Sequence, residues 1–271
     1  MIEILFAIMQ AAFILALAPL ITGLIRKLKA TMQSRRGPPI WQPYYDLAKL
    51  FRKNSVASKD ASWVSAIAPY VCMAAMDAGS TFGGMGSSRE MMISSIIEPA
   101  ILLAIFTTAL LTGTTNLGLI SKELATSGAD FVRPSLFLAF AAFFIATLAE
   151  NARLPFDNPT THLELAMVHE GMLLEYSGKQ LALMEWSSMT KLLLFMAIGW
   201  NAFLPWGIAT SVEAGAIAIG ILVFIAKVLL LVIAIALIES SIAKLRLFRL
   251  PNLLTVSFML AFLAVLSFYI L

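Results

Sequence analysis

The chain has 271 residues, of which 60% are hydrophobic and only 13% are charged, and its mean hydropathy is +0.88. This composition excludes an ordinary soluble domain, and uninterrupted apolar runs of about 20 residues indicate membrane-spanning helices. The runs lack an alternation with a period of two, which excludes a β-barrel, the other structure that satisfies its backbone in lipid. We therefore predict an all-α, polytopic helix bundle that forms a single transmembrane domain over residues 1–271.

Charge and cysteine content narrow the possible partners. The chain contains nineteen Lys and Arg and sixteen Asp and Glu. In a membrane protein this small basic excess indicates topology rather than nucleic-acid binding. Cys72, the single cysteine, excludes an intrachain disulfide and a cysteine-ligated cluster. We expect a chain that contacts the lipid bilayer, binds no nucleic acid and holds no metal or cofactor itself.

The first predicted span covers residues 2–25, and a polar link follows over residues 26–60. The N-terminus has no basic region and its apolar run is longer than a signal-peptide core, so we expect a retained span. Nine of the nineteen Lys and Arg fall between Arg26 and Lys59, which predicts a cytoplasmic link and an N-terminus outside.

The link contains a proline-rich turn and then an amphipathic segment. Residues 35–39 (RRGPP) cannot be helical, because two prolines fix φ and remove hydrogen-bond donors. Residues 43–53 predict a short helix at a membrane surface or against a partner. Its apolar face carries Tyr44, Leu47, Leu50 and Phe51, and its polar face carries Asp46, Lys49 and Lys53. The residues expected to dock a partner are Arg35, Arg36, Asp46 and Lys49.

Counting crossings predicts a re-entrant segment at residues 61–82. The basic turn at 244–249 should be cytoplasmic, and counting back from it puts the polar turn at 83–90 inside. The 26–60 link is also inside, so residues 61–82 enter and leave on one face, and about 20 residues cannot cross twice. Complete spans are predicted at 2–25, 91–111, 131–149, 181–206, 213–239 and 252–271, with the loop at 112–130 outside.

Residues 150–179 form a predicted cytoplasmic loop that concentrates titratable groups between two spans. These groups are Glu150, Arg153, Asp157, His162, Glu164, His169, Glu170 and Glu175. Ionisable groups beside membrane spans are costly to keep there, so proton or charge handling is the leading interpretation.

Each candidate in this loop also has a structural interpretation. Glu150 and Arg153 are three residues apart and close enough to pair, either within a proton path or as an ion pair that fixes the loop. Glu164 and Glu175 share one stripe of a predicted helix and face either a proton path or solvent and a partner. His162 and His169 lack the i, i+4 spacing of a helical zinc site, so no metal is predicted.

Four further groups lie in apolar surroundings. Asp77 and Glu98 are candidates for a proton path, although Glu98-Pro99 is also compatible with the first turns of a helix. Lys191 and Lys227 lie inside spans. Lys227 is about fourteen residues, or roughly 21 Å, from the start of its helix, so we expect it to meet a carboxylate or a water-filled cavity. Glu239, near the other end, is expected only to anchor the helix.

Five ordered motifs resemble one family over nearly the whole chain. They are residues 35–39 with the helix after them, the G-S-S-R-E of 86–90, E-x-x-R-x-P-F-D at 150–157, H-L-E-L at 162–165 and E-Y-S-G at 175–178. They resemble the membrane subunit homologous to subunit 1 of respiratory complex I and its bacterial counterpart. The amino-acid sequences of residues 83–90, 157–159 and 162–165 are more similar to those of the corresponding subunit in energy-conserving [NiFe]-hydrogenases of the Ech and formate hydrogenlyase type.

The resemblance implies a subunit in a prokaryotic cytoplasmic membrane that joins a hydrophilic redox arm to a proton-pumping arm. The implied partners are [NiFe]-hydrogenase-like and Fe–S subunits, which carry the cofactors, and an antiporter-like membrane subunit. The implied residues of the path are Glu90, Glu150, Arg153, Asp157, Glu164 and Glu175. We further expect Arg89 and His169 to act with Arg153 as charge partners. The family usually has eight spans, and here only residues 61–82 stand where it has a helix pair.

Four functions remain open from the sequence. The leading one is a proton-pathway and docking subunit of a hydrogenase-type complex. The second is a subunit that holds quinone in an NADH-quinone oxidoreductase. The third is a free-standing transporter, against which we find no matching halves with interrupted helices. The fourth is a purely structural anchor.

Overall fold

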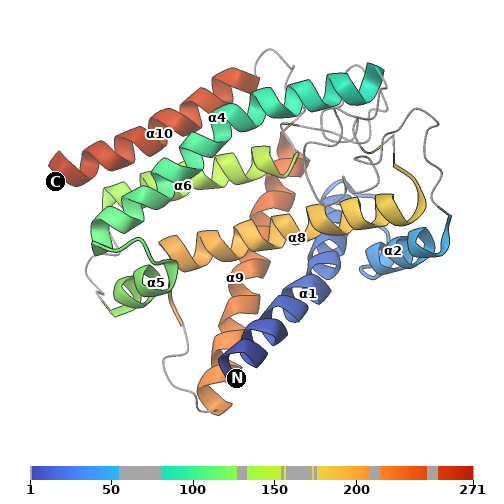
Figure 1. Cartoon of the computed structure of the whole chain (residues 1–271), viewed down its shortest axis with the longest axis horizontal. Helices are drawn as coiled ribbons and strands as arrows, with labels where there is room; N and C mark the ends of the chain where they lie inside the picture. Colours follow the sequence, from blue (N-terminus) through green and yellow to red (C-terminus); the bar gives the residue numbers. More distant parts are fainter. Residues whose placement is uncertain are drawn as a thin grey trace. The chain divides into compact units, whose positions relative to one another are not determined.

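The computed structural model describes residues 2–54, 81–126, 133–153, 156, 173, 176–207, 214–242 and 250–270. These residues form eight helices and no strand (Figure 1). The helices are α1 (Ile2–Met32), α2 (Gln42–Arg52), α4 (Thr81–Thr112), α5 (Leu117–Thr126), α6 (Pro134–Glu150), α8 (Gly178–Phe203), α9 (Ala214–Ser241) and α10 (Leu250–Ile270). The all-α prediction is confirmed, and the predicted re-entrant segment at 61–82 lies largely outside the described residues.

Five of the described helices are long and apolar enough to cross a membrane, namely α1, α4, α8, α9 and α10. The sixth predicted span corresponds to α6, which has 17 residues. At 1.5 Å per residue α6 is about 25 Å long, close to the lower limit for a crossing. The prediction of a polytopic helix bundle is therefore confirmed.

Two predicted features of residues 83–99 are wrong. Residues 83–90 are not a turn but the first part of the 32-residue helix α4, and Pro99 lies in the interior of that helix rather than in its first turns. Ser87 is only 3% exposed, and a backbone buried away from water needs its hydrogen bonds inside the helix. This requirement outweighs the weak helix propensity of the glycines and serines.

Two other segments are more helical than expected. Helix α1 continues past residue 25 to Met32, so Lys27 and Lys29 extend the helix, and basic residues suit its C-terminal end. Part of the predicted outer loop forms α5. The Asn116 side chain caps α5 by accepting hydrogen bonds from the backbone N–H groups of Gly118 at 3.0 Å and Leu119 at 3.4 Å.

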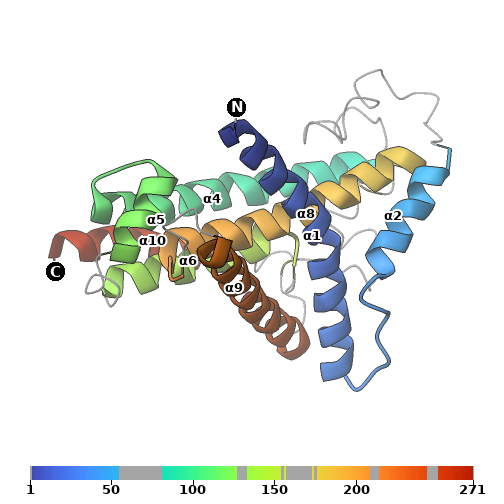
Figure 2. The same cartoon turned by 90° about the horizontal axis from the view of Figure 1, so that it is seen from below.

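The described chain divides into two compact units. The first comprises residues 1–92, 151–194 and 235–244. In this unit α2 lies beside α1 (Figure 2), and a Cβ added to Gly23 of α1 would collide with the Ile40 carbonyl oxygen. Leu47 is buried while Lys49 is exposed, so the predicted amphipathic helix is confirmed.

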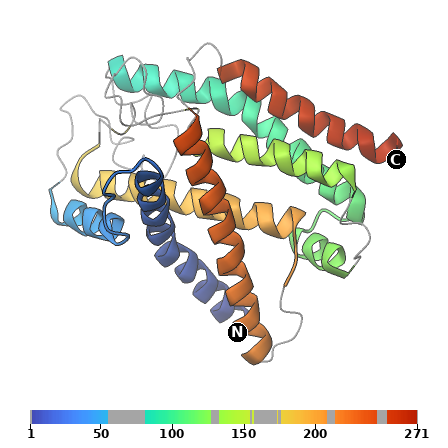
Figure 3. The ribbon, with the colours of Figure 1, turned by 180° about the vertical axis from the view of Figure 1, so that it is seen from behind.

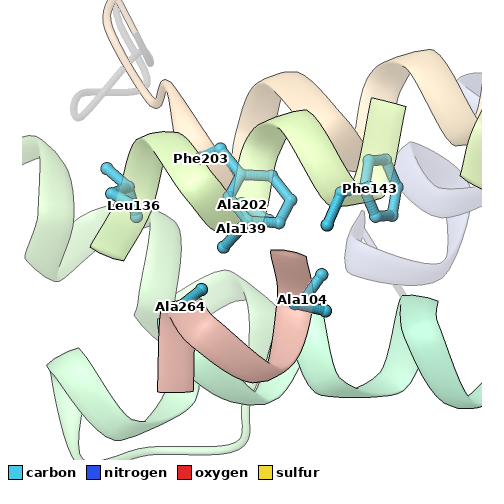
Figure 4. Packing of buried hydrophobic residues seen from close by; sticks show 9 residues of the cluster. Ala104, Leu136, Ala139, Phe143, Ala202, Phe203 and Ala264 are labelled. Atoms are coloured by element: carbon cyan, nitrogen blue, oxygen red, sulfur yellow. The ribbon is translucent and has the colours of Figure 1, made fainter. Parts of the chain in front are cut away.

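The second unit comprises residues 93–150, 195–234 and 245–271. In it α6 and α10 run side by side (Figures 1 and 3). Small residues line their contact, which lets helix backbones approach closely in a membrane. Ser257 on α10 donates a hydrogen bond to the Ala142 carbonyl of α6 at 2.8 Å. Figure 4 shows the core around Phe143 and Phe203, whose ring centroids lie 5.3 Å apart.

Candidate functional site

A buried carboxylate shared by two cations lies in the first unit. Glu239 belongs to the last turn of α9, and its side chain is only 5% exposed. One carboxylate oxygen, Oε2, lies 3.1 Å from Lys29 Nζ, and the other, Oε1, lies 3.4 Å from Arg153 Nη1. Lys29 lies in the last turn of α1 and Arg153 follows α6, so three segments far apart in sequence meet at this carboxylate. We call these residues the Glu239 cluster.

The Glu239 cluster holds its charges away from water. A charge removed from water is costly unless an opposite charge and hydrogen bonds compensate it. Burial lowers the pKa of the Arg153 guanidinium, the nearby charge of Arg26 lowers it further, and the negative charge of Glu239 opposes both effects. Among the described residues, the cluster joins two cations to one carboxylate, so the electrostatic energy of each member depends on the other two.

A second carboxylate in the first unit lies near Arg26, whose charge also acts on Arg153. Glu185, near the start of α8, is half-buried and lies within electrostatic reach of Arg26 on α1 and Asp46 on α2. Asp46 is half-buried and accepts a hydrogen bond from Gln42 Nε2 at 2.9 Å. Because Arg26 acts on both Arg153 and Glu185, it links the Glu239 cluster electrostatically to this second carboxylate.

The structure places eleven of the sixteen predicted site residues. Half-buried positions are occupied by Arg89, Glu90, Glu150, Arg153, Lys191, Lys227 and Asp46, and exposed positions by Glu98, Arg35, Arg36 and Lys49. The other five, Asp77, Asp157, Glu164, His169 and Glu175, lie outside the described residues. Arg153 is the predicted site residue that joins the Glu239 cluster.

Arg153 forms its ion pair with Glu239, 86 residues away in sequence. The predicted pairing of Arg153 with Glu150 stays a prediction. Glu239 itself was expected only to anchor its helix, so its central position is a finding of the structure. One signal in the sequence pointed to it, because a carboxylate at the C-terminal end of a helix opposes the helix dipole and needs a cation beside it. Glu185 carried a similar signal as an acid within an apolar run.

Lys227 contacts a backbone carbonyl group and an aromatic ring. Its ammonium group donates a hydrogen bond to the Leu204 carbonyl oxygen at 2.8 Å and lies 5.9 Å from the centroid of the Trp200 ring. The expected carboxylate partner is not found within the described part of the chain. The carbonyl groups at the end of α8 carry the negative end of its dipole, and an aromatic face also attracts a cation. Together they compensate the charge of Lys227.

A search of the described residues finds no group of three or more His, Cys, Asp or Glu side chains that could hold a metal ion. His162 and His169 lie outside these residues. The charged groups that the structure brings together are the carboxylate of Glu239 with Lys29 and Arg153, and the carboxylates of Glu185 and Asp46 near Arg26.

Comparison with known proteins identifies the family. The profile described as NADH dehydrogenase matches residues 4–76 and 64–270. The chain is 31% identical to formate hydrogenlyase subunit 4 of Escherichia coli (strain K12), with 98% of each chain covered. It is 30% identical to hydrogenase-4 component C of the same strain, over 96% of this chain and 94% of the relative. It is 26% identical to a subunit of the NADH-quinone oxidoreductase of Rubrobacter xylanophilus, over 74% of this chain and 72% of the relative.

A solved structure shares the fold. The membrane-bound sulfane sulfur reductase, an archaeal respiratory membrane complex, contains a chain that superposes with a TM-score of 0.84 at 18% identity and covers 98% of this chain and 99% of that one. The alignment with formate hydrogenlyase subunit 4 runs over 306 positions, more than the 271 residues here, so that relative has residues without a counterpart. The two matched segments overlap at residues 64–76. This overlap lies within residues 61–82, which stand where the family usually has a helix pair. With the profile spanning nearly the whole chain, the protein belongs to the NADH dehydrogenase family.

Proposed function

We propose that the chain is the membrane-anchor and ion-pathway subunit that couples a [NiFe]-hydrogenase-type redox module to ion translocation. The observation that carries this proposal is the Glu239 cluster, in which the buried Glu239 carboxylate is shared by the half-buried cations Lys29 and Arg153. Full-length similarity to formate hydrogenlyase subunit 4 and hydrogenase-4 component C supports the hydrogenase-type module.

The cluster serves this function by responding to charge. A carboxylate shared between two cations can change its ion-pair partner when another charge arrives nearby. A rearrangement of the Glu239 cluster would also alter the electrostatic environment of Glu185, because the charge of Arg26 acts on both Arg153 and Glu185. From there the proposed proton path uses Glu90, Glu98, Glu150, Lys191 and Lys227, together with Asp77, Asp157, Glu164 and Glu175 outside the described residues.

The proposed partners follow from the exposed charges and from the family. Arg35, Arg36 and Lys49 are exposed around α2 and would meet hydrophilic hydrogenase-like and Fe–S subunits, whereas Asp46 is turned partly inward. An antiporter-like membrane subunit completes the assembly. The [NiFe] centre and Fe–S clusters would be bound by the partner subunits. The chain would lie in a prokaryotic cytoplasmic membrane with its N-terminus outside.

A second candidate function is a quinone-holding subunit of an NADH-quinone oxidoreductase, and the similarity to the Rubrobacter xylanophilus relative favours it. Purification of the complex from its native membrane separates the two. A co-purifying [NiFe] subunit with hydrogen-dependent turnover supports the hydrogenase-type function. Quinone-dependent turnover without such a subunit supports the alternative.

Charge-neutralising variants test the ion pathway in inverted membrane vesicles. Glu185→Gln should retain the subunit composition and redox turnover of the complex but lower the number of ions moved per turnover several-fold. Any Glu239→Gln complex that assembles should show the same loss of ion movement. The matched control is Glu123→Gln, since Glu123 is exposed on α5. If the assembled Glu185→Gln complex, and any Glu239→Gln complex that assembles, move as many ions per turnover as the unmodified complex, these carboxylates only anchor helices.

A further inference from the structure

Pro19 interrupts the hydrogen bonding of α1. The proline lies inside the helix and has no backbone N–H, so the Leu15 carbonyl, four residues earlier, lacks its intrahelical donor. The affected residues belong to a candidate membrane span. In lipid, a carbonyl without a hydrogen-bond donor costs several kcal/mol, so another donor is needed there.

Two side chains from other helices reach this part of α1. Trp186 on α8 donates its indole N–H to the Leu15 carbonyl oxygen at 2.9 Å. Tyr44 on α2 donates its hydroxyl to the next carbonyl, that of Ala16. Both side chains therefore contact α1 at carbonyl groups beside the proline.

The contacts around these two side chains join three helices. Phe51 on α2 packs edge-on against Trp186, with ring centroids 6.3 Å apart and an interplanar angle of 88°. The same helix carries Asp46, whose charge acts on Glu185, the residue next to Trp186. Helix α2, which lies beside α1 (Figure 2), thus also reaches α8 through Phe51 and through the charge of Asp46.

We propose that the Pro19 gap is a latch, in which Tyr44 and Trp186 are positioning residues that hold α2 against α1 and α8 by donating to the carbonyl groups beside the proline. A partner docked on the exposed side of α2 then acts on the spans through this latch and on Glu185 through Asp46. The docking half of this inference rests on the proposed function, whereas the latch itself does not.

Hydrogen–deuterium exchange of the α2 backbone tests the latch in the full chain, reconstituted in lipid nanodiscs. Tyr44→Phe and Trp186→Phe each remove one donor and keep an aromatic ring. A single hydrogen bond corresponds to roughly a three- to tenfold change in an equilibrium, so exchange in α2 should accelerate about three- to tenfold. Tyr45→Phe is the matched control, because the neighbouring Tyr45 is 67% exposed, and its exchange should equal that of the unmodified chain.

The Pro19→Ala background supplies the decisive comparison. Residue 19 then has an N–H for the Leu15 carbonyl, so Trp186→Phe should change exchange in α2 much less than it does with proline present. Unchanged exchange in the single variants overturns the latch. So does an equal effect of Trp186→Phe in both backgrounds, because that result would trace to packing rather than to the gap.

The proposed action of a docked partner on the spans is measured separately, in the assembled complex. Tyr44→Phe and Trp186→Phe should keep redox turnover and lower the ions moved per turnover, and an unchanged ratio overturns this half. The exchange experiment needs no redox partner, so the latch can fail while the proposed function stands. Conversely, a failed Glu185→Gln test leaves the exchange results unaffected.

Discussion

At the scale of single residues, the most consequential side chain is the carboxylate of Glu239. It lies at the C-terminal end of α9, where the helix dipole is unfavourable for an anion, and it is almost fully buried. Lys29 and Arg153 compensate both costs. Each member of the Glu239 cluster therefore depends on the others, and the cost of removing one depends on the charge left behind.

We expect Glu239→Gln to destabilise the chain by about 3–5 kcal/mol, because it leaves two neighbouring cations without their carboxylate. Lys29→Gln should cost about 1 kcal/mol or less, since it leaves a balanced Arg153–Glu239 pair and since the Lys29 side chain is 23% exposed. The free energy of unfolding measures both. Lys27→Gln, at an exposed position of the same helix, is the control. Equal costs for Glu239→Gln and Lys29→Gln would contradict the shared-carboxylate arrangement.

At the scale of helices, both units depend on close contacts between backbones. In the second unit, small residues bring α6 and α10 together, and a buried hydrogen bond joins them. In the first, Gly23 brings α1 against the link before α2. These contacts tolerate little added volume, because protein interiors are closely packed.

Ser257→Ala should lower the free energy of unfolding by about 1 kcal/mol, since interhelical hydrogen bonds in membrane proteins have about this value. Ser257 is fully buried and its partner, the Ala142 carbonyl, lies on another helix. Thr255→Ala, which removes an exposed hydroxyl bonded within its own helix, should have a smaller effect. The prediction is wrong if the two variants are equally stable.

Gly23→Ala should displace the link and α2 from α1, because the new methyl group would collide with the Ile40 carbonyl oxygen. Faster backbone exchange in α2 is the expected readout. Gly215→Ala adds the same methyl group to α9 where nothing lies within 4 Å, so exchange there should be unchanged or slower. Normal protection of α2 in Gly23→Ala would show that the link adapts without loosening.

At the scale of the whole molecule, topology decides whether the acidic and basic loops share one face of the membrane. The sequence predicts that residues 26–60 are inside and that residues 112–130 are outside, with the segment at 61–82 re-entrant. Between these two loops the described residues contain one long span, α4. A complete crossing by 61–82 would instead put both loops on the same side.

Cysteine labelling in a Cys72→Ser background distinguishes these topologies. Gln33→Cys and Thr115→Cys place single thiols at exposed positions in the two loops. In sealed, right-side-out vesicles a membrane-impermeant reagent should label Thr115→Cys and not Gln33→Cys, and permeabilisation should expose both. Equal labelling of the two thiols before permeabilisation would overturn the re-entrant prediction.

The sequence by itself determined the class of the protein, the places of six apolar helices and the amphipathic helix α2. These are local properties, since length, hydropathy and periodicity act within one segment and lipid enforces helical hydrogen bonding. The helical form of residues 83–90 was not evident from the local sequence, because Gly and Ser have weak helix propensity and the burial of Ser87, which is 3% exposed, is a tertiary property.

Only the tertiary structure decided which distant groups meet. Glu239 pairs with Arg153 across 86 residues, and Trp186 reaches Leu15 across 171. Neither contact leaves a periodic signal in the chain, because each depends on how whole helices pack. The sequence could show that a buried charge or an interrupted helix needs a partner, and the folded arrangement of the helices determined which residue that partner is.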